Sequence, residues 1–159
     1  MLMRGLIAAI VLALVTITAE AQHINLQSEK DRLQKQAVLL VQFLKQTNAT
    51  IPRQVGDFHC TTNLLHTTSI SVAFVNWMKE LIDLSAKMRD PTDKAVIYTT
   101  IGKHNELAMT MIDNSKTYID VAAGPCPENV YVNGKATELR SITTETLAIL
   151  TQIRAKVKM

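Results

Sequence analysis

Histidine is the side chain in this sequence that most directly invites a search for metal or acid–base chemistry. The chain has four histidines, and two of them, His66 and His104, fall within apolar helical patterns. If the two predicted helices that carry them fold back on each other near residue 90, His66 lies opposite about residue 114. His104 is then about 15 Å away along the helix axes, at a rise of 1.5 Å per residue. The two histidines are therefore not expected to share an ion, and no metal site is predicted.

Other chemistries that helical bundles support need motifs that are missing here. After residue 23 the chain has no Glu-x-x-His pair for a di-iron site, no Cys-x-x-Cys-His for covalent haem and no Gly-x-Ser-x-Gly elbow for a serine nucleophile. Adjacent His59 and Cys60 leave a thiolate hydrolase as a third hypothesis, which requires Cys60 to carry a free thiol. The sequence predicts no catalytic residues and no cofactor, and hence a protein that is not an enzyme.

Polar side chains within the two central helical patterns raise the question of a binding groove. Hydroxyl and amide residues are frequent between 67 and 71 and between 99 and 115. They either hydrogen-bond to the carbonyls of their own helices or line a groove for a small ligand or partner helix. Trp77 and Tyr98 lie on opposite sides of the connection at residue 90, and together with His104 they form the candidate ligand groove.

Four segments carry helical periodicity. The first begins at Ser28 and ends near Asn48, and the second begins just after Cys60, with Thr61 or Thr62 as its N-cap. The third runs from Asp90 as N-cap to Gly124, and the last has its apolar face between residues 139 and 157. Residues 124–137 are expected to form a loop, with a small turn or hairpin at 130–134 because Asn-Gly favours type I′ geometry. The pattern predicts an all-α, up-down four-helix bundle.

The two cysteines provide a check on this layout. Cys60 precedes the second predicted helix and Cys126 follows the third, so an antiparallel pair brings both to the same end of the bundle. A disulfide requires Cα atoms within about 7 Å, which this topology permits. We therefore expect a Cys60–Cys126 disulfide joining the start of the second helix to the loop after the third.

The N-terminal residues have the features of a secretory signal peptide. Arg4 precedes an apolar run of about a dozen residues, and Ala19-Glu20-Ala21 provides small residues at −3 and −1. This predicts cleavage after residue 21, a single helical domain over 22–159, no transmembrane segment in the mature chain, and a secreted or periplasmic location. The formal charge of +3 is mild and dispersed, which argues against nucleic-acid binding. Asn48-Ala49-Thr50 is a glycosylation sequon that matters only in a host that glycosylates this pathway.

The leading functional hypothesis is an exported, non-enzymatic helical bundle that binds a protein or envelope component. It places an exposed apolar strip on the first helix after residue 22, with Leu40 and Phe43 as the candidate partner surface. The alternative is a small-molecule or metal carrier with a site inside the bundle near the second and third helices. The sequence leaves the partner, the ligand and the oligomeric state open.

Overall fold

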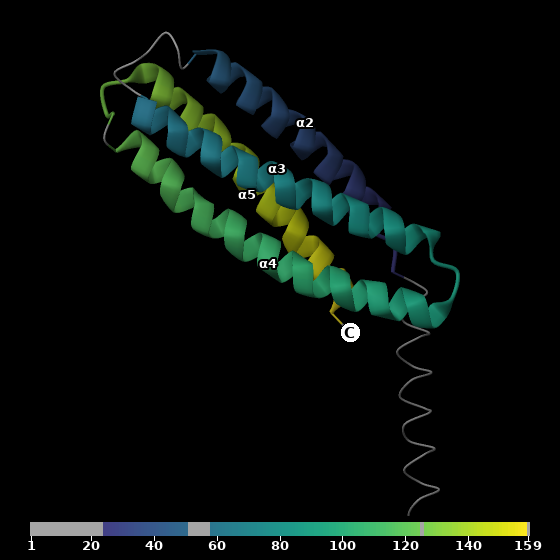
Figure 1. Cartoon of the computed structure of the whole chain (residues 1–159). Helices are drawn as coiled ribbons and strands as arrows, with labels where there is room; N and C mark the ends of the chain where they lie inside the picture. The colour runs from purple at the N-terminus through teal and green to yellow at the C-terminus, as the bar shows by residue number, and fades with distance from the viewer. Residues whose placement is uncertain (1–23, 51–57, 125, 159) are drawn as a thin grey trace, which may run out of the picture.

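The computed structural model describes residues 24–50, 58–124 and 126–158. These residues form four helices: α2 (Gln27–Thr50), α3 (Phe58–Lys87), α4 (Pro91–Ala123) and α5 (Val130–Val157). Successive helices run in opposite directions along the bundle (Figure 1). The prediction of an all-α, up-down four-helix bundle is confirmed.

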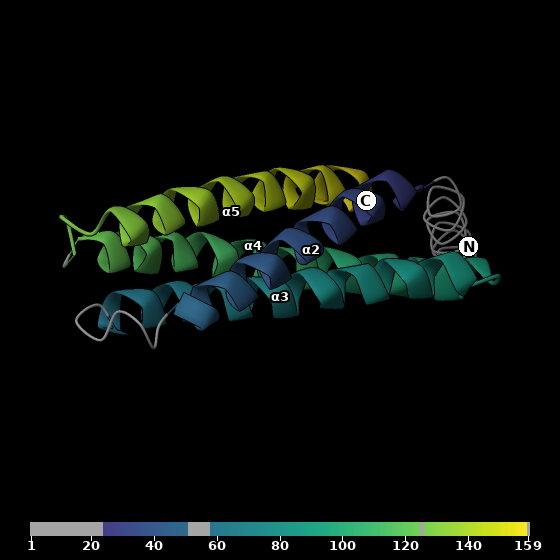
Figure 2. The same cartoon turned by 90° about the horizontal axis from the view of Figure 1, so that it is seen from above.

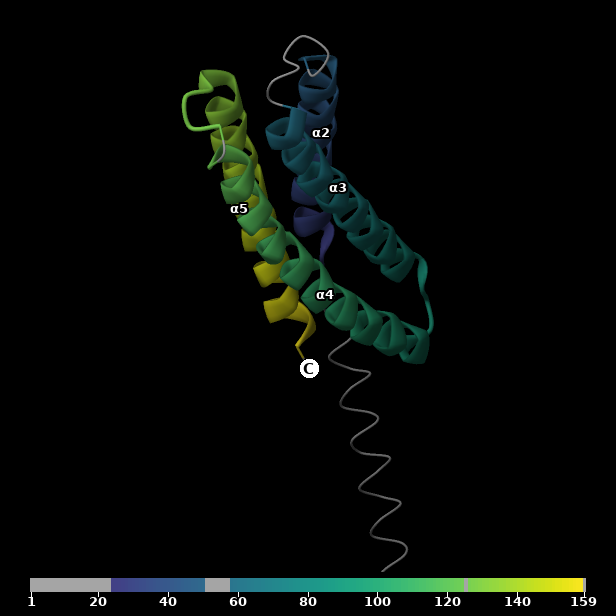
Figure 3. The same cartoon turned by 60° about the vertical axis from the view of Figure 1, so that its left-hand side comes forward.

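Each helix packs mainly against two others, which sets the order of the helices around the bundle. α3 lies between α2 and α4, and α5 closes the ring by contacting both α4 and α2. α3 and α4 are the longest helices, and their connected end reaches beyond the C-terminal end of α5 (Figure 2). Figure 3 shows the bundle from the side. In the half of the bundle that holds the α4–α5 connection, α4 lies alongside α5, and α2 lies alongside α3.

The apolar part of the core is largely aliphatic, as the low aromatic content requires, and polar side chains such as Thr67, Ser71 and Thr146 are completely buried beside it. Its largest completely buried members include one aromatic ring, that of Phe43, among leucine, isoleucine and methionine side chains. Two or more of these side chains come from every helix, so all four helices share one core.

The boundaries of α4 follow directly from local sequence. The Asp90 carboxylate accepts hydrogen bonds from the backbone N–H groups of Thr92 and Asp93, at 2.7 and 3.2 Å, and these bonds hold the pKa of Asp90 below its usual value. Pro91 occupies the first helical position, where its missing N–H costs nothing. The helix ends at Ala123, and the Gly124 N–H donates to the Asp120 carbonyl. Both predicted ends of this helix are confirmed.

Two other helix starts differ from the prediction. α3 begins at Phe58, so Cys60 lies in its first turn rather than before it. α5 begins at Val130, because the Asn129 side chain accepts a hydrogen bond from the Val132 N–H at 3.0 Å and caps the helix. The predicted turn or hairpin at 130–134 is therefore wrong, and Gly134 lies within a helix.

The Cys60–Cys126 disulfide is present, with Cα atoms 6.6 Å apart. It links the first turn of α3 to the connection between α4 and α5. The short turn at residues 88–90 joins α3 to α4 at the other end, so the α3–α4 pair is covalently closed at both ends.

Residues 1–21, the predicted signal peptide, lie outside the described residues, so their cleavage stays a prediction. Among the helices that the structure does describe, none combines the length and apolar character needed to cross a membrane.

Candidate functional site

Two of the three residues predicted to form a ligand groove meet on the surface. The rings of Trp77 on α3 and His104 on α4 have centroids 4.3 Å apart, and Phe74 packs beside Trp77. Tyr98 is not part of this group, because it is buried and its hydroxyl donates to the Ile24 carbonyl at 2.9 Å. The structure thus brings together an exposed aromatic pair rather than the predicted three-residue groove.

The hydroxyl groups of α3 and α4 do not converge on one groove, since Ser85 and Tyr98 border a pocket of about 410 Å³ beside residues 24–27 and Thr110 borders a groove between α4 and α5. Most of them donate to carbonyls one turn earlier in their own helices, as Thr68 does to Leu64 and Thr99 does to Ala95. These hydrogen bonds satisfy the side chains locally. Most hydroxyl groups of the two helices are therefore satisfied without a ligand, whereas the buried Asn105 Oδ1 on α4 has no hydrogen-bond partner among the described residues.

A second ring contact lies in the same seam, the line along which α3 and α4 meet. His66 packs edge-on against Tyr118, with ring centroids 6.1 Å apart. His66 was expected opposite residue 114, so the predicted pairing of the helices is correct to about one turn. Together the two ring contacts mark the outer side of the α3–α4 seam over a distance of about 16 Å, from the spacing of residues 66 and 77.

The residues on this outer side form an uncharged stripe on each helix, and we call the two stripes together the α3–α4 face. Spacings of three and four residues place them in one stripe on each helix. The face consists of His66, Ile70, Phe74, Trp77, Leu81 and Leu84 on α3, and Thr100, His104, Leu107, Met111, Asn114, Tyr118 and Val121 on α4. None of these residues is Asp, Glu, Lys or Arg, but the exposed Lys103 lies on the same line of α4 as Val121, five turns away, and borders the face.

Several large apolar side chains of the face remain open to solvent. Trp77 is 39% exposed, Leu107 45% and Tyr118 47%, and Leu84, Met111 and Val121 are exposed to a similar degree. Single exposed apolar residues are common on protein surfaces, but a contiguous set along two adjacent helices is typical of an interaction site. From its length of about 27 Å and the width of a helix pair, the face covers about 500 Å².

Ion pairs distinguish the other seams from this one. Lys30 pairs with Asp83 between α2 and α3, and Arg140 pairs with Asp120 between α4 and α5. Between α2 and α5 the pairs are Arg32–Glu145 and Lys156–Glu29. Over the part of the chain that the structure describes, no ion pair joins α3 to α4. Of the four seams between neighbouring helices, the α3–α4 seam is thus the one without an ion pair among the described residues, and the Thr67 hydroxyl donates to the Ser115 carbonyl across it at 3.4 Å.

The partner surface predicted on the first helix requires a correction. Leu40 and Phe43 are completely buried in the core, so a partner cannot contact them while the bundle is folded. They point inward because they belong to the same helical stripe as Leu33 and Ala37, which also lie in the core. The exposed apolar residues of α2 are Val38 and Leu39 instead.

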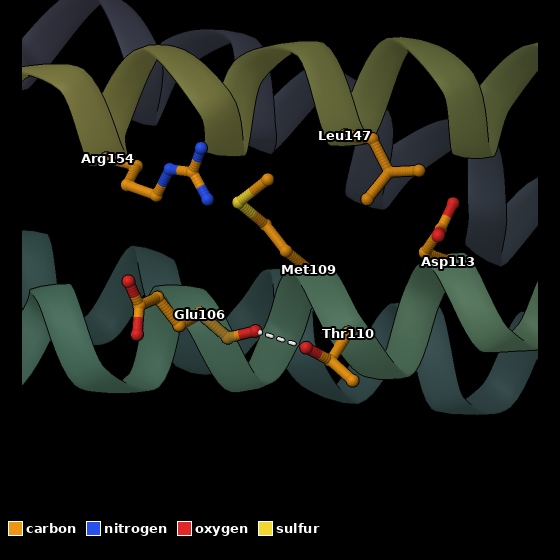
Figure 4. Close-up of a pocket in the computed structure, with 6 residues that line it drawn as sticks. All are labelled: Glu106, Met109, Thr110, Asp113, Leu147 and Arg154. Carbon is orange, nitrogen blue, oxygen red and sulfur yellow. Dashed lines mark hydrogen bonds between the residues drawn. The ribbon is translucent and has the colours of Figure 1, made fainter.

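A separate groove lies between α4 and α5, with a volume of about 460 Å³ (Figure 4). Met109 and Leu147 provide its apolar lining, and the Arg154 side chain extends into it from α5. Two carboxylates, those of Glu106 and Asp113, also line the groove, and Asp113 is paired with Lys116 at 3.1 Å. Among the described residues, Arg154 has no ion-pair partner. Sequence analysis missed this groove because its residues come from two helices and match no motif.

The remaining candidate chemistry finds no support in the geometry. Within the described ranges, no group of three or more His, Cys, Asp or Glu residues is arranged to hold a metal ion. Cys60 is bonded to Cys126, which removes the free thiol that the hydrolase hypothesis required. The His59 side chain lies outside the described residues.

Compared with protein-family models, with curated proteins and with solved structures, the chain matches none. Its function is therefore argued from its own residues.

Proposed function

We propose that this chain is an exported, non-enzymatic helical-bundle protein that acts by binding a protein partner through the α3–α4 face. The observation that carries the proposal is the uncharged α3–α4 face, which exposes Trp77, Leu107 and Tyr118 and lacks the ion pairs of the other seams. Exposed aromatic side chains are typical anchors of protein interfaces.

The size of the face lies at the lower limit for a specific complex. Burying about 500 Å² of mostly apolar surface contributes about 10 kcal/mol from this side alone. The loss of translational and rotational freedom on association costs about 4–15 kcal/mol, and the partner's own buried surface adds to the gain. The partner must present an uncharged surface as well, because burying an unpaired charge against this face costs several kcal/mol.

Export is supported by two independent features of the chain. The N-terminal residues have the pattern of a signal peptide, and the two cysteines are joined in a disulfide, a bond that persists in oxidising compartments. N-terminal sequencing of the protein recovered outside the cytoplasm is expected to begin at Gln22. Recovery of the full-length chain from the cytoplasm, starting at Met1, would contradict export.

Site-specific photo-crosslinking in the cells that make the protein tests the binding role. A photoreactive residue at Leu107 is expected to give a discrete adduct, and the same residue at Val38, an exposed position on α2, is expected to give none. The Leu107 adduct should disappear in a Trp77→Glu background, because the charge disrupts the face without touching the core. Equal crosslinking at both positions, or an adduct indifferent to Trp77→Glu, would refute the role of the face.

The α4–α5 groove favours a second candidate function, that of a small-molecule carrier. Arg154 has no ion-pair partner among the described residues and lies beside Met109 and Leu147, which suits a ligand with an anionic head and an apolar tail, while the Glu106 and Asp113 carboxylates of the same groove oppose an anion. Decanoate is then expected to raise the melting temperature, and Arg154→Gln should abolish that rise. A melting temperature that does not respond to decanoate would contradict this second candidate.

A further inference from the structure

We infer that the occupant of the α3–α4 face is a second copy of this chain, related by a two-fold axis parallel to α3 and α4. This inference rests on the proposed function, since it names the partner of the same surface. In such a dimer the two faces lie against each other, and α3 of each copy packs on α4 of the other.

The uncharged character of the face suits a second copy of the same face. Its exposed residues are apolar or uncharged, so an identical face satisfies the requirement for an uncharged partner without any further assumption. Two copies would bury about 1,000 Å² in total, which reaches the lower limit for a specific interface.

The two edges of the face carry opposite charges, which makes the face complementary to a second copy of itself. Glu80 lies on α3 at the edge away from α4, because it is 300° around the helix from Trp77. Lys103 lies on α4 at the edge away from α3, one residue before His104. Neither side chain has an ion-pair partner among the described residues, and both are exposed.

The register of the two helices places these charges at one level. Since Trp77 packs on His104, and His66 packs on Tyr118, Glu80 and Lys103 lie within about 3 Å of each other along the helix axes. A two-fold axis parallel to the helices keeps levels unchanged and exchanges the two edges. It therefore sets Glu80 opposite Lys103 of the partner subunit, and the same pair recurs at the other edge.

The arrangement leaves the aromatic residues at the centre of the interface. Trp77 of one copy faces the level of His104 in the other, so the ring pairs of both copies come together between the two edge ion pairs. An apolar centre enclosed by polar edges is the usual organisation of a protein interface.

Sedimentation analysis of the purified, disulfide-bonded protein tests this inference. The protein is expected to sediment as a dimer at micromolar concentration, and Leu107→Glu is expected to make it monomeric. Val38→Glu, the matched change on α2, should leave the dimer intact. Because Leu107 and Val38 are each 45% exposed, neither charge disturbs the core, so both variants should stay folded, and Leu107→Glu should lose only the stability that dimerisation adds.

A charge exchange tests the orientation of the two copies. Glu80→Lys and Lys103→Glu should each weaken dimerisation about tenfold or more, since each change places like charges together twice in the dimer. The double variant, which reverses both charges, should recover most of the lost affinity. Failure of the double variant to recover affinity would refute the proposed axis.

Two further outcomes separate this inference from the proposed function. A protein that stays monomeric at every concentration, yet crosslinks through Leu107 to a different protein, would overturn the dimer and leave the binding role of the face standing. A dimer that survives Leu107→Glu would also overturn the inference, because its interface would then lie elsewhere.

Discussion

The Cys60–Cys126 disulfide is expected to supply a large part of the stability of this domain. The bridge spans a sequence separation of 66 residues, so it removes about 4 kcal/mol of chain entropy, at 25 °C, from the unfolded state. The free energy of unfolding of a typical domain is about 5–15 kcal/mol in total. Reduction should therefore lower the free energy of unfolding by about 4 kcal/mol. The decrease is smaller if the reduced unfolded chain retains structure that limits its entropy.

The position of the disulfide also predicts which part of the bundle opens most readily after reduction. It holds the first turn of α3 to the connection after α4, whereas the turn at residues 88–90 holds the same two helices together at the other end. After reduction, amide hydrogen exchange should rise most in the first turns of α3 and the last turns of α4. The exchange of amides near residue 90 should change less.

Urea unfolding of the oxidised and the reduced protein measures the effect without replacing a side chain. A Cys60→Ala/Cys126→Ala variant serves as the control, because its stability should not respond to the reductant. If reduction changes the free energy of unfolding by less than about 1 kcal/mol, the entropic argument for this bridge is refuted.

The remaining predictions concern the core, one helix and one ion pair. Leu40→Ala should lower the free energy of unfolding by about 2–5 kcal/mol, because Leu40 is completely buried. The exposed control Val38→Ala should change it by about 0.5 kcal/mol or less. Urea unfolding measures both values. Gly134→Ala should stabilise the protein by about 0.5–1 kcal/mol, because Gly134 lies inside α5 and no heavy atom lies within 4 Å of the added Cβ; a lower melting temperature would contradict this. The hydrogen bond from the Lys30 ammonium lowers the pKa of Asp83 from its ordinary value of 3.8. The ionised carboxylate therefore stabilises the folded state above pH 3.8, and this stabilisation is lost as the pH falls through the lowered pKa. Asp83→Asn should therefore lower the melting temperature at neutral pH and have a diminishing effect in acid, and a deficit that does not change with pH would refute the assignment.

The fold was predictable wherever a local signal agrees with the packing of the whole bundle. Asp90 and Pro91 begin α4 as expected, because capping and the fixed proline backbone act within a few residues. The disulfide was predictable because the position of each cysteine relative to its helix already fixes which end of the bundle it reaches.

The start of α5 was not predictable from turn preferences alone. Asn133-Gly134 favours a hairpin turn in isolation, but Asn129 caps a helix that includes both residues. The buried side chain of Val132 joins the core, and this packing outweighs the local turn preference. Tertiary contacts decide such a case, and a single sequence does not display them.

The candidate site was predictable only in part, for a related reason. Trp77 and His104 were expected near each other, and they meet because the α3–α4 connection is short. Leu40 was assigned to the surface because α2 is apolar nearly all round between residues 37 and 44. Which side of such a helix faces the core depends on α3 and α5, and that choice becomes visible only when the helices are packed.

Covalent carbene footprinting of the protein inside the cells that produce it tests the central claim most directly. Labelling there is compared with labelling of the purified chain diluted to nanomolar concentration. If a partner covers the α3–α4 face, Trp77, Leu107 and Tyr118 should be protected in the cells, while Val38 and Val130, exposed outside the face, should label equally in both samples. Equal labelling of the α3–α4 face in both samples would contradict the claim that this surface is where the protein binds.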